Sequence, residues 1–101
     1  MTVDVPDALF PLGRVLATRG IAEKLTDLGL GLHGSLDTYL ARHATGDWGE
    51  LDDEDQATND WAVVFGGERL LSEYRLVDRT RIWVITEADR STTTVLLPEE
   101  Y

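Results

Sequence analysis

The fold class is decided by residues 70–97, which read LLSEYRLVDRTRIWVITEADRSTTTVLL. At the start of this stretch the apolar Leu70, Tyr74 and Leu76 alternate with charged side chains, which is typical of a strand with one buried face. The two later apolar runs are rich in β-branched and aromatic residues, which favour strands. We therefore predict a C-terminal three-stranded antiparallel meander, with strands at residues 70–76, 81–86 and 92–97.

The residues before this meander predict one more strand and three helices. A short apolar run follows Pro11, and beyond it the apolar residues recur at helical spacing. The predicted elements are a strand at 12–18 and helices at 20–28, from Ser35 to about residue 45, and from Asp52 to about Phe65. The third helix has an apolar face that we expect to be buried, formed by Ala57, Trp61, Val64 and Phe65.

Together these elements predict a single α+β domain over residues 1–101. The predicted order is βαααβββ, with three helices packed on a small, mainly antiparallel sheet. The glycine-rich stretch 29–34 is predicted as a loop between the first two helices. The expected aromatic anchors of the core are Trp48, Trp61 and Trp83, with an exposed contact residue as the alternative role of Trp83.

The composition is typical of a soluble globular domain, with 43% hydrophobic and 28% charged residues. The absence of cysteine excludes disulfides and thiolate chemistry. No apolar stretch is long enough to span a membrane and the N-terminus lacks the pattern of a signal peptide, so a cytoplasmic protein is expected. The formal net charge of −10 disfavours direct binding to nucleic acid, because phosphates are bound through Lys and Arg.

Most of the negative charge lies in residues 47–60, which carry seven acidic side chains and no basic one. The first turn of a helix favours such residues, because carboxylates accept hydrogen bonds from its unpaired N–H groups. Four consecutive carboxylates at 52–55 exceed what capping requires. Two interpretations follow, a solvated helix start and a negative face that docks on a basic partner. The candidate partner-binding residues are Asp47, Glu50, Asp52, Asp53, Glu54, Asp55 and Asp60.

The sequence predicts neither a metal site nor a cofactor. Its two histidines, His33 and His43, match no spacing that would place two imidazoles on one ion. The glycines of residues 29–34 match the bare GxGxxG pattern, but they follow a predicted helix rather than a strand, so no dinucleotide site is expected. We expect His43 near the end of the second helix, half-packed against Tyr39.

Three blocks of sequence resemble a family of small bacterial proteins that are commonly labelled plasmid-related or hypothetical. The blocks are FPLGRVLAT at 10–18, LARHxxGDWG at 40–49, and WVITEADRSxTTVLLPxEY at 83–101. The resemblance implies a setting in mobile elements and their hosts, and it brings no established activity or ligand. It also singles out a candidate functional cluster of polar residues, which a compact structural network would explain equally well: Arg42, His43, Asp47, Glu87, Asp89, Arg90 and Ser91.

Two functions from different classes follow. The first is a small acidic binding module that acts by protein–protein contact, on a nucleic-acid-handling host protein. The second is a compact ribonuclease-like or toxin-like enzyme, in which His43, Glu87 and Arg90 would supply a general base, a general acid and a cation for phosphate. A third alternative is a homodimer that pairs through an exposed strand edge. The sequence neither favours nor excludes catalysis.

Overall fold

The computed structural model describes residues 3–101, apart from the side chains of Leu32 and His33. Its elements follow the predicted order, and the α+β class is confirmed. The strands are β1 (Arg14–Ala17), β2 (Leu70–Arg75), β3 (Arg81–Thr86) and β4 (Thr92–Leu96). The helices are α1 (Arg19–Asp27), α2 (Leu32–Ala44), α3 (Asp53–Phe65) and a short C-terminal 3-10 helix, η1 (Pro98–Glu100).

The four strands form one mixed sheet with the order β1-β4-β3-β2. Strands β2, β3 and β4 pair antiparallel, as the predicted meander requires. Strand β1 joins them in parallel with β4, with Val15 opposite Thr93, so the sheet is not a simple antiparallel meander. Parallel neighbours need a long crossover, and here three helices and two strands lie between them along the chain. Among the described strands, β1 has β4 as its single neighbour.

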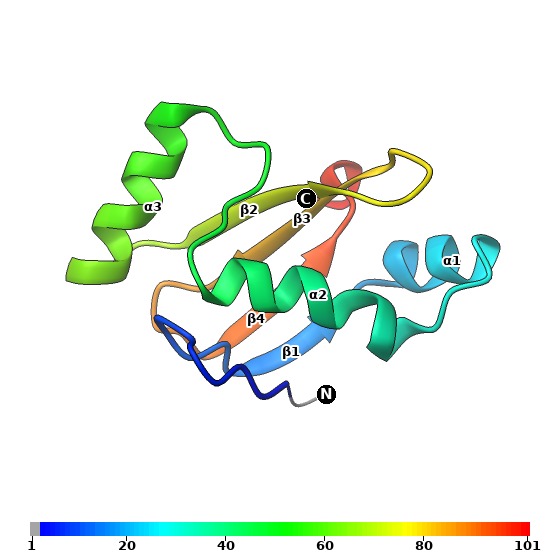
Figure 1. Ribbon diagram of the computed structural model, residues 1–101, viewed down its shortest axis with the longest axis horizontal. Coiled ribbons are helices and arrows are strands. Elements are labelled where there is room, and N and C mark those ends of the chain that lie inside the picture. The colour runs from blue at the N-terminus through cyan, green and yellow to red at the C-terminus, as the bar shows by residue number, and fades with distance from the viewer. Residues whose placement is uncertain (1–2) are drawn as a thin grey trace.

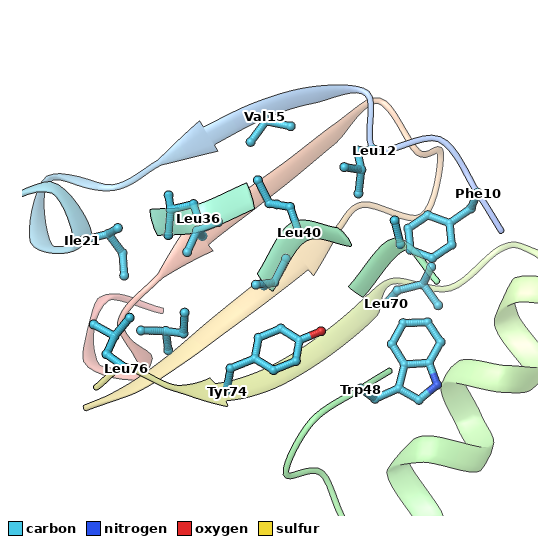
Figure 2. Packing of buried hydrophobic residues seen from close by; sticks show 14 of the residues in the cluster. Phe10, Leu12, Val15, Ile21, Leu36, Leu40, Trp48, Leu70, Tyr74 and Leu76 are labelled. Carbon is cyan, nitrogen blue, oxygen red and sulfur yellow. The ribbon is translucent and has the colours of Figure 1, made fainter. Parts of the chain in front are cut away.

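Helix α2 lies across one face of the sheet, whereas α1 and α3 lie toward opposite ends of the molecule (Figure 1). Its Leu36 and Leu40 are fully buried. Figure 2 shows these two side chains among core residues from the strands, including Val15 and Tyr74. The spacing of apolar residues along α2 therefore predicted its buried face correctly.

Helix α2 begins three residues earlier than the sequence predicts. Its N-cap is Gly31, and the N–H of Ser35 donates to the carbonyl of Gly31 as part of the first turn. The expected glycine loop is therefore shorter, and it turns at Gly29, whose φ of 71° suits glycine. A glycine inside a helix costs only about 1 kcal/mol relative to alanine, so Gly34 does not stop α2.

The tryptophans have different environments. Trp48 is buried, and its ring stacks on Phe10 at 6.2 Å between centroids. Trp83 is half-buried and makes an edge contact with Tyr101 at 5.6 Å. Trp61 is exposed, contrary to the prediction that it anchors the core. Only one of the three expected anchors is therefore fully inside.

The outer edge of β2 is closed by contacts from elsewhere in the chain. At Glu73 the segment 48–50 runs alongside, since the N–H of Glu73 donates to the carbonyl of Trp48 and its own carbonyl accepts from Glu50. At Arg75 the backbone carbonyl accepts the hydroxyl proton of Tyr39, at 3.0 Å. These contacts occupy the groups that would otherwise pair with another strand.

Helix α3 closes the remaining part of this edge. The side-chain amide of Asn59 donates to the carbonyl of Leu71 at 2.7 Å, and its oxygen accepts the N–H of Leu71 at 3.3 Å. The side-chain amide of Asn59 thus makes the two backbone hydrogen bonds that a neighbouring strand would make to Leu71. Beside it Ala62 is fully buried, and its carbonyl accepts a hydrogen bond from the guanidinium of Arg90.

Candidate functional site

The outward side of α3 carries large apolar side chains. Trp61 is 53% exposed, Val64 73% and Phe65 69%, and the rings of Trp61 and Phe65 pack against each other at 4.9 Å. The prediction that this face is buried is therefore wrong. The helix buries the opposite side, where Asn59 and Ala62 lie.

Hydrogen bonds explain why α3 turns its apolar face outward. Two of the residues that fix α3 face the sheet: Asn59, which bonds the edge of β2, and Ala62, whose carbonyl bonds Arg90. Turning the helix to bury Trp61 would break these bonds and leave the backbone of Leu71 without them. Apolar periodicity does not register such bonds. A mid-helix asparagine, a poor helix former in a surface helix, is the one signal in the sequence that could have indicated them.

Four of the seven acidic residues in the 47–60 segment have structural partners. Asp47 pairs with Arg42, Glu50 pairs with Arg75, the Asp52 carboxylate caps α3 by accepting the N–H of Asp55, and Asp60 accepts the indole N–H of Trp48. The Arg42 guanidinium lowers the pKa of Asp47 below its usual range. These four carboxylates hold the local structure together.

The other three are Asp53, Glu54 and Asp55, which are all exposed in the first turn of α3. Among the side chains that the structure describes, none forms an ion pair with them. Their helix continues into the exposed apolar side chains. We call the outward surface the α3 outer face, and it consists of Asp53, Glu54, Ala57, Trp61, Val64 and Phe65. Asp55 is exposed in the same first turn, but it precedes Asn59 by four residues and Ala62 by seven, so it lies on their side of the helix.

His43 lies inside the core, with no exposed surface, instead of half-packing against Tyr39 as predicted. Its ring makes edge contacts with Phe10 at 5.4 Å and with Trp48 at 5.6 Å. Its Nδ1 lies 2.6 Å from the hydroxyl of Ser72, and its Nε2 lies 2.9 Å from that of Thr86. The ring therefore joins α2 to both β2 and β3.

Proton counting fixes the direction of this buried chain of hydrogen bonds. The hydroxyl of Thr93 donates to the carbonyl of Leu12 at 2.7 Å, so it accepts from Thr86 at 2.7 Å. The single proton of Thr86 is then used, so its oxygen accepts from Nε2–H of His43. Nδ1 is left as an acceptor for Ser72. The chain is complete with a neutral imidazole.

The charged form of His43 is disfavoured. Burial, with a smaller contribution from the positive charge of Arg90, lowers the pKa of His43 to about 3. A protonated ring would also carry a proton on Nδ1, where the chain needs an acceptor. His43 is thus a neutral structural residue. It has no surface on which to meet a substrate, so the geometry does not support the expected role as a general base.

Arg90 and Glu87 lie on the turn between β3 and β4 and are bonded to different partners. The guanidinium of Arg90 donates to the backbone carbonyls of Glu68, Glu87, Ala88 and Ala62. The carboxylate of Glu87 accepts from Arg69 at 3.1 Å. Arg90 therefore ties the turn to the end of α3, and His43, Glu87 and Arg90 form no open site.

The remaining members of the candidate cluster are also held locally. Asp89 accepts both the N–H and the hydroxyl proton of Ser91, and these bonds lower the pKa of its carboxyl. Arg42 bonds Asp47 at 2.7 Å and lies 4.5 Å above the ring of Tyr74. The polar residues singled out by the resemblance fall into three groups: the Arg42–Asp47 pair, the buried His43 chain, and the turn at 87–91.

A cleft of about 400 Å³ lies between α2 and the turn that joins β2 to β3. Arg42 and Arg75 line it, and each pairs with a carboxylate, Asp47 and Glu50 respectively. The charge of the two arginines is therefore already balanced, which weakens the cleft as a site for an anion. His43, Glu87 and Arg90 are not among its lining residues.

Within the described part of the chain, no group of three or more histidine, aspartate or glutamate side chains is placed to hold a metal ion. The side chain of His33, one of the two histidines considered for such a site, lies outside the described residues. Among the helices described, none is both long and apolar enough to cross a bilayer.

Compared with known proteins, the chain matches no family model, and no curated protein or solved structure is significantly similar to it. These comparisons add no support to the resemblance described above. The α3 outer face is therefore the candidate functional site on physical grounds alone.

Proposed function

We propose that this protein is a small acidic binding module that docks on a protein partner through the α3 outer face. The observation that carries the proposal is the exposure of Trp61, Val64 and Phe65 on the helix that also holds three exposed carboxylates without an ion pair among the described side chains. Contiguous exposed apolar side chains rimmed by polar residues are typical of interaction sites.

The composition of this face suits a binding surface. Tryptophan and other aromatic residues contribute most to the energy of protein interfaces when they enter a pocket on the partner. Carboxylates at the rim increase the rate of encounter with a positively charged surface. The helix is also held in place by Asn59 and Arg90, so little ordering is required on binding.

The partner expected from this charge is a basic protein. Proteins that handle nucleic acid present such surfaces, because they neutralise phosphates with Lys and Arg. A nucleic-acid-handling host protein is therefore the partner class that we propose, consistent with a setting in mobile elements. The acidic face itself would repel nucleic acid.

Affinity capture from a bacterial lysate tests the proposal. The wild type is compared with Trp61→Ala/Phe65→Ala, with Asp53→Asn/Glu54→Gln/Asp55→Asn, and with Val77→Ala, an exposed apolar residue on another surface. Asp52 and Asp60 are left intact because they hold the structure. A basic protein retained by the wild type and Val77→Ala, and lost from the other two variants, would support the proposal.

The affinity of the retained protein is then measured with each variant. The aromatic variant should bind about 100-fold more weakly, because truncating an interface aromatic costs about 2–4 kcal/mol. Equal retention by all four proteins would contradict the proposal. A ribonuclease-like activity gains no such support, since His43 is buried and Arg90 is bonded to backbone carbonyls.

A further inference from the structure

We infer that the segment seated on the α3 outer face is a basic amphipathic α-helix of the partner. This inference rests on the proposed function and specifies the partner that the face is shaped to accept. It follows from the spacing of the apolar side chains, the distribution of charge along α3, and the state of the neighbouring sheet edge.

The apolar side chains form a stripe along the helix axis. Trp61 lies four residues after Ala57, and Phe65 lies four residues after Trp61, so the three occupy successive turns of one face. Val64 lies beside Phe65, at the C-terminal end of the stripe. Phe65 lies eight positions after Ala57, so the stripe is about 12 Å long at a rise of about 1.5 Å per residue.

A strand is a poor occupant for this surface. The backbone groups within α3 are bonded along the helix, and the β2 edge beside it is closed by Asn59 and the segment 48–50. The partner must therefore be recognised by side chains alone. A second helix matches a straight stripe of side chains, because the ridges of one helix pack into the grooves of another at an axial separation of about 8–10 Å.

The charge of α3 is concentrated at one end. Asp53, Glu54 and Asp55 occupy the first turn, and the aromatic pair occupies the last two turns. A complementary helix carries Lys or Arg where it meets the first turn and apolar residues where it meets the aromatic pair. A second copy of this chain brings the same carboxylates and a formal net charge of −10, which opposes self-association.

The test uses the full-length protein and a synthetic 14-residue peptide of leucine and lysine, with leucines at helical spacing. A matched leucine and glutamate peptide and a scrambled leucine and lysine peptide serve as controls. The readout is the indole N–H signals in a two-dimensional NMR spectrum. The indoles of Trp48 and Trp83 donate to Asp60 and Glu73 inside the domain, whereas Trp61 lies on the stripe.

We expect the basic amphipathic peptide to shift the Trp61 signal, to leave that of Trp83 in place, and to bind at least about tenfold more tightly than either control peptide. The variant Val64→Ser/Phe65→Ser retains Trp61 as the reporter and should bind about tenfold more weakly. Asp53→Asn/Glu54→Gln should bind more weakly than Asp27→Asn/Asp37→Asn, which removes the same charge from α1 and α2.

Three results would overturn the inference. These are an unmoved Trp61 signal, equal binding by the two charge variants, and a Trp61 signal that shifts with protein concentration alone, which would make a second copy the occupant. Failure here is distinguishable from failure of the proposed function. A lysate protein held through α3 without any peptide effect refutes only the helical partner, whereas equal capture by all variants refutes the docking surface itself.

Discussion

Helices α2 and α3 each have 13 residues, and each carries an apolar stripe at helical spacing, yet they orient in opposite ways. Helix α2 turns its stripe inward and even takes a histidine into the core. Helix α3 turns its stripe outward and buries an asparagine. The difference shows that helix orientation depends on which groups the neighbouring sheet presents.

The two helices meet different parts of the sheet. Helix α2 covers a face, where the strands present side chains and apolar burial decides the orientation. Helix α3 meets an edge, where β2 presents backbone N–H and C=O groups that need partners. A helix on a sheet face is oriented by burial of its apolar stripe, whereas a helix at a sheet edge is oriented by hydrogen bonds to the edge strand.

The largest contrast is expected between matched truncations of the two stripes. Leu40→Ala in α2 should lower the free energy of unfolding by about 3 kcal/mol, because it leaves a cavity in the core. Val64→Ala in α3 should change it by less than about 0.5 kcal/mol, because the side chain is exposed. Urea denaturation measures both values. Similar losses in the two variants would mean that the α3 stripe is buried in solution.

The buried His43 of α2 makes the free energy of unfolding depend on pH. The pKa of His43 is about 3 in the folded chain and about 6.5 when unfolded, so the unfolded chain takes up a proton first as the pH falls. Stability contributed by the neutral ring is complete above pH 6.5 and is lost between pH 6.5 and 3. The loss should reach about 2 kcal/mol at pH 5, at about 1.4 kcal/mol per pH unit.

Urea denaturation at pH 8 and pH 5 measures this loss. His43→Gln, which can both donate and accept a hydrogen bond but does not titrate, should show a much smaller change between the two pH values. The interval lies above the lowered pKa values of Asp47 and Asp89, and the comparison with His43→Gln separates the effect of His43 from that of the other titrating groups. An identical change in both proteins would show that His43 does not govern the effect.

The smallest of the three effects concerns the edge contact of α3. Asn59→Ala removes two hydrogen bonds to Leu71 and should lower the free energy of unfolding by about 1–2 kcal/mol. Thr58→Ala, one residue away and exposed, is the control. If Asn59→Ala were neutral and Trp61 became less accessible to a fluorescence quencher, apolar burial rather than hydrogen bonding would set the orientation of α3.

The sequence predicted those parts of the fold that depend on local patterns. Alternation over residues 70–76 and the β-branched runs after it placed β2, β3 and β4, and helical spacing placed α1, α2 and α3. The parallel pairing of β1 with β4 joins residues about 80 positions apart, and no local pattern specifies such a partner. The sequence therefore did not predict that the sheet is mixed, and the structure was required to show it.

The candidate site was predicted less well. The acidic segment was recognised from its charge, but the exposed aromatic residues beside it were assigned to the core, because periodicity marks an apolar face without telling which way it points. His43 was expected to be half-packed against Tyr39, and its full burial was missed because its partners Ser72, Thr86 and Thr93 come from three different strands. In both cases long-range polar contacts decided the outcome.

A sheet that can accept a strand on one side only cannot grow into a fibre. Cross-β growth requires each added chain to offer a fresh edge to the next. Strands β1 and β2 are the two edges of the sheet. The outer edge of β2 is engaged by Asn59, Tyr39 and the segment 48–50, so among the described strands β1 alone offers an open edge. If two copies joined through β1, both open edges would be consumed, so edge-to-edge addition ends at two chains.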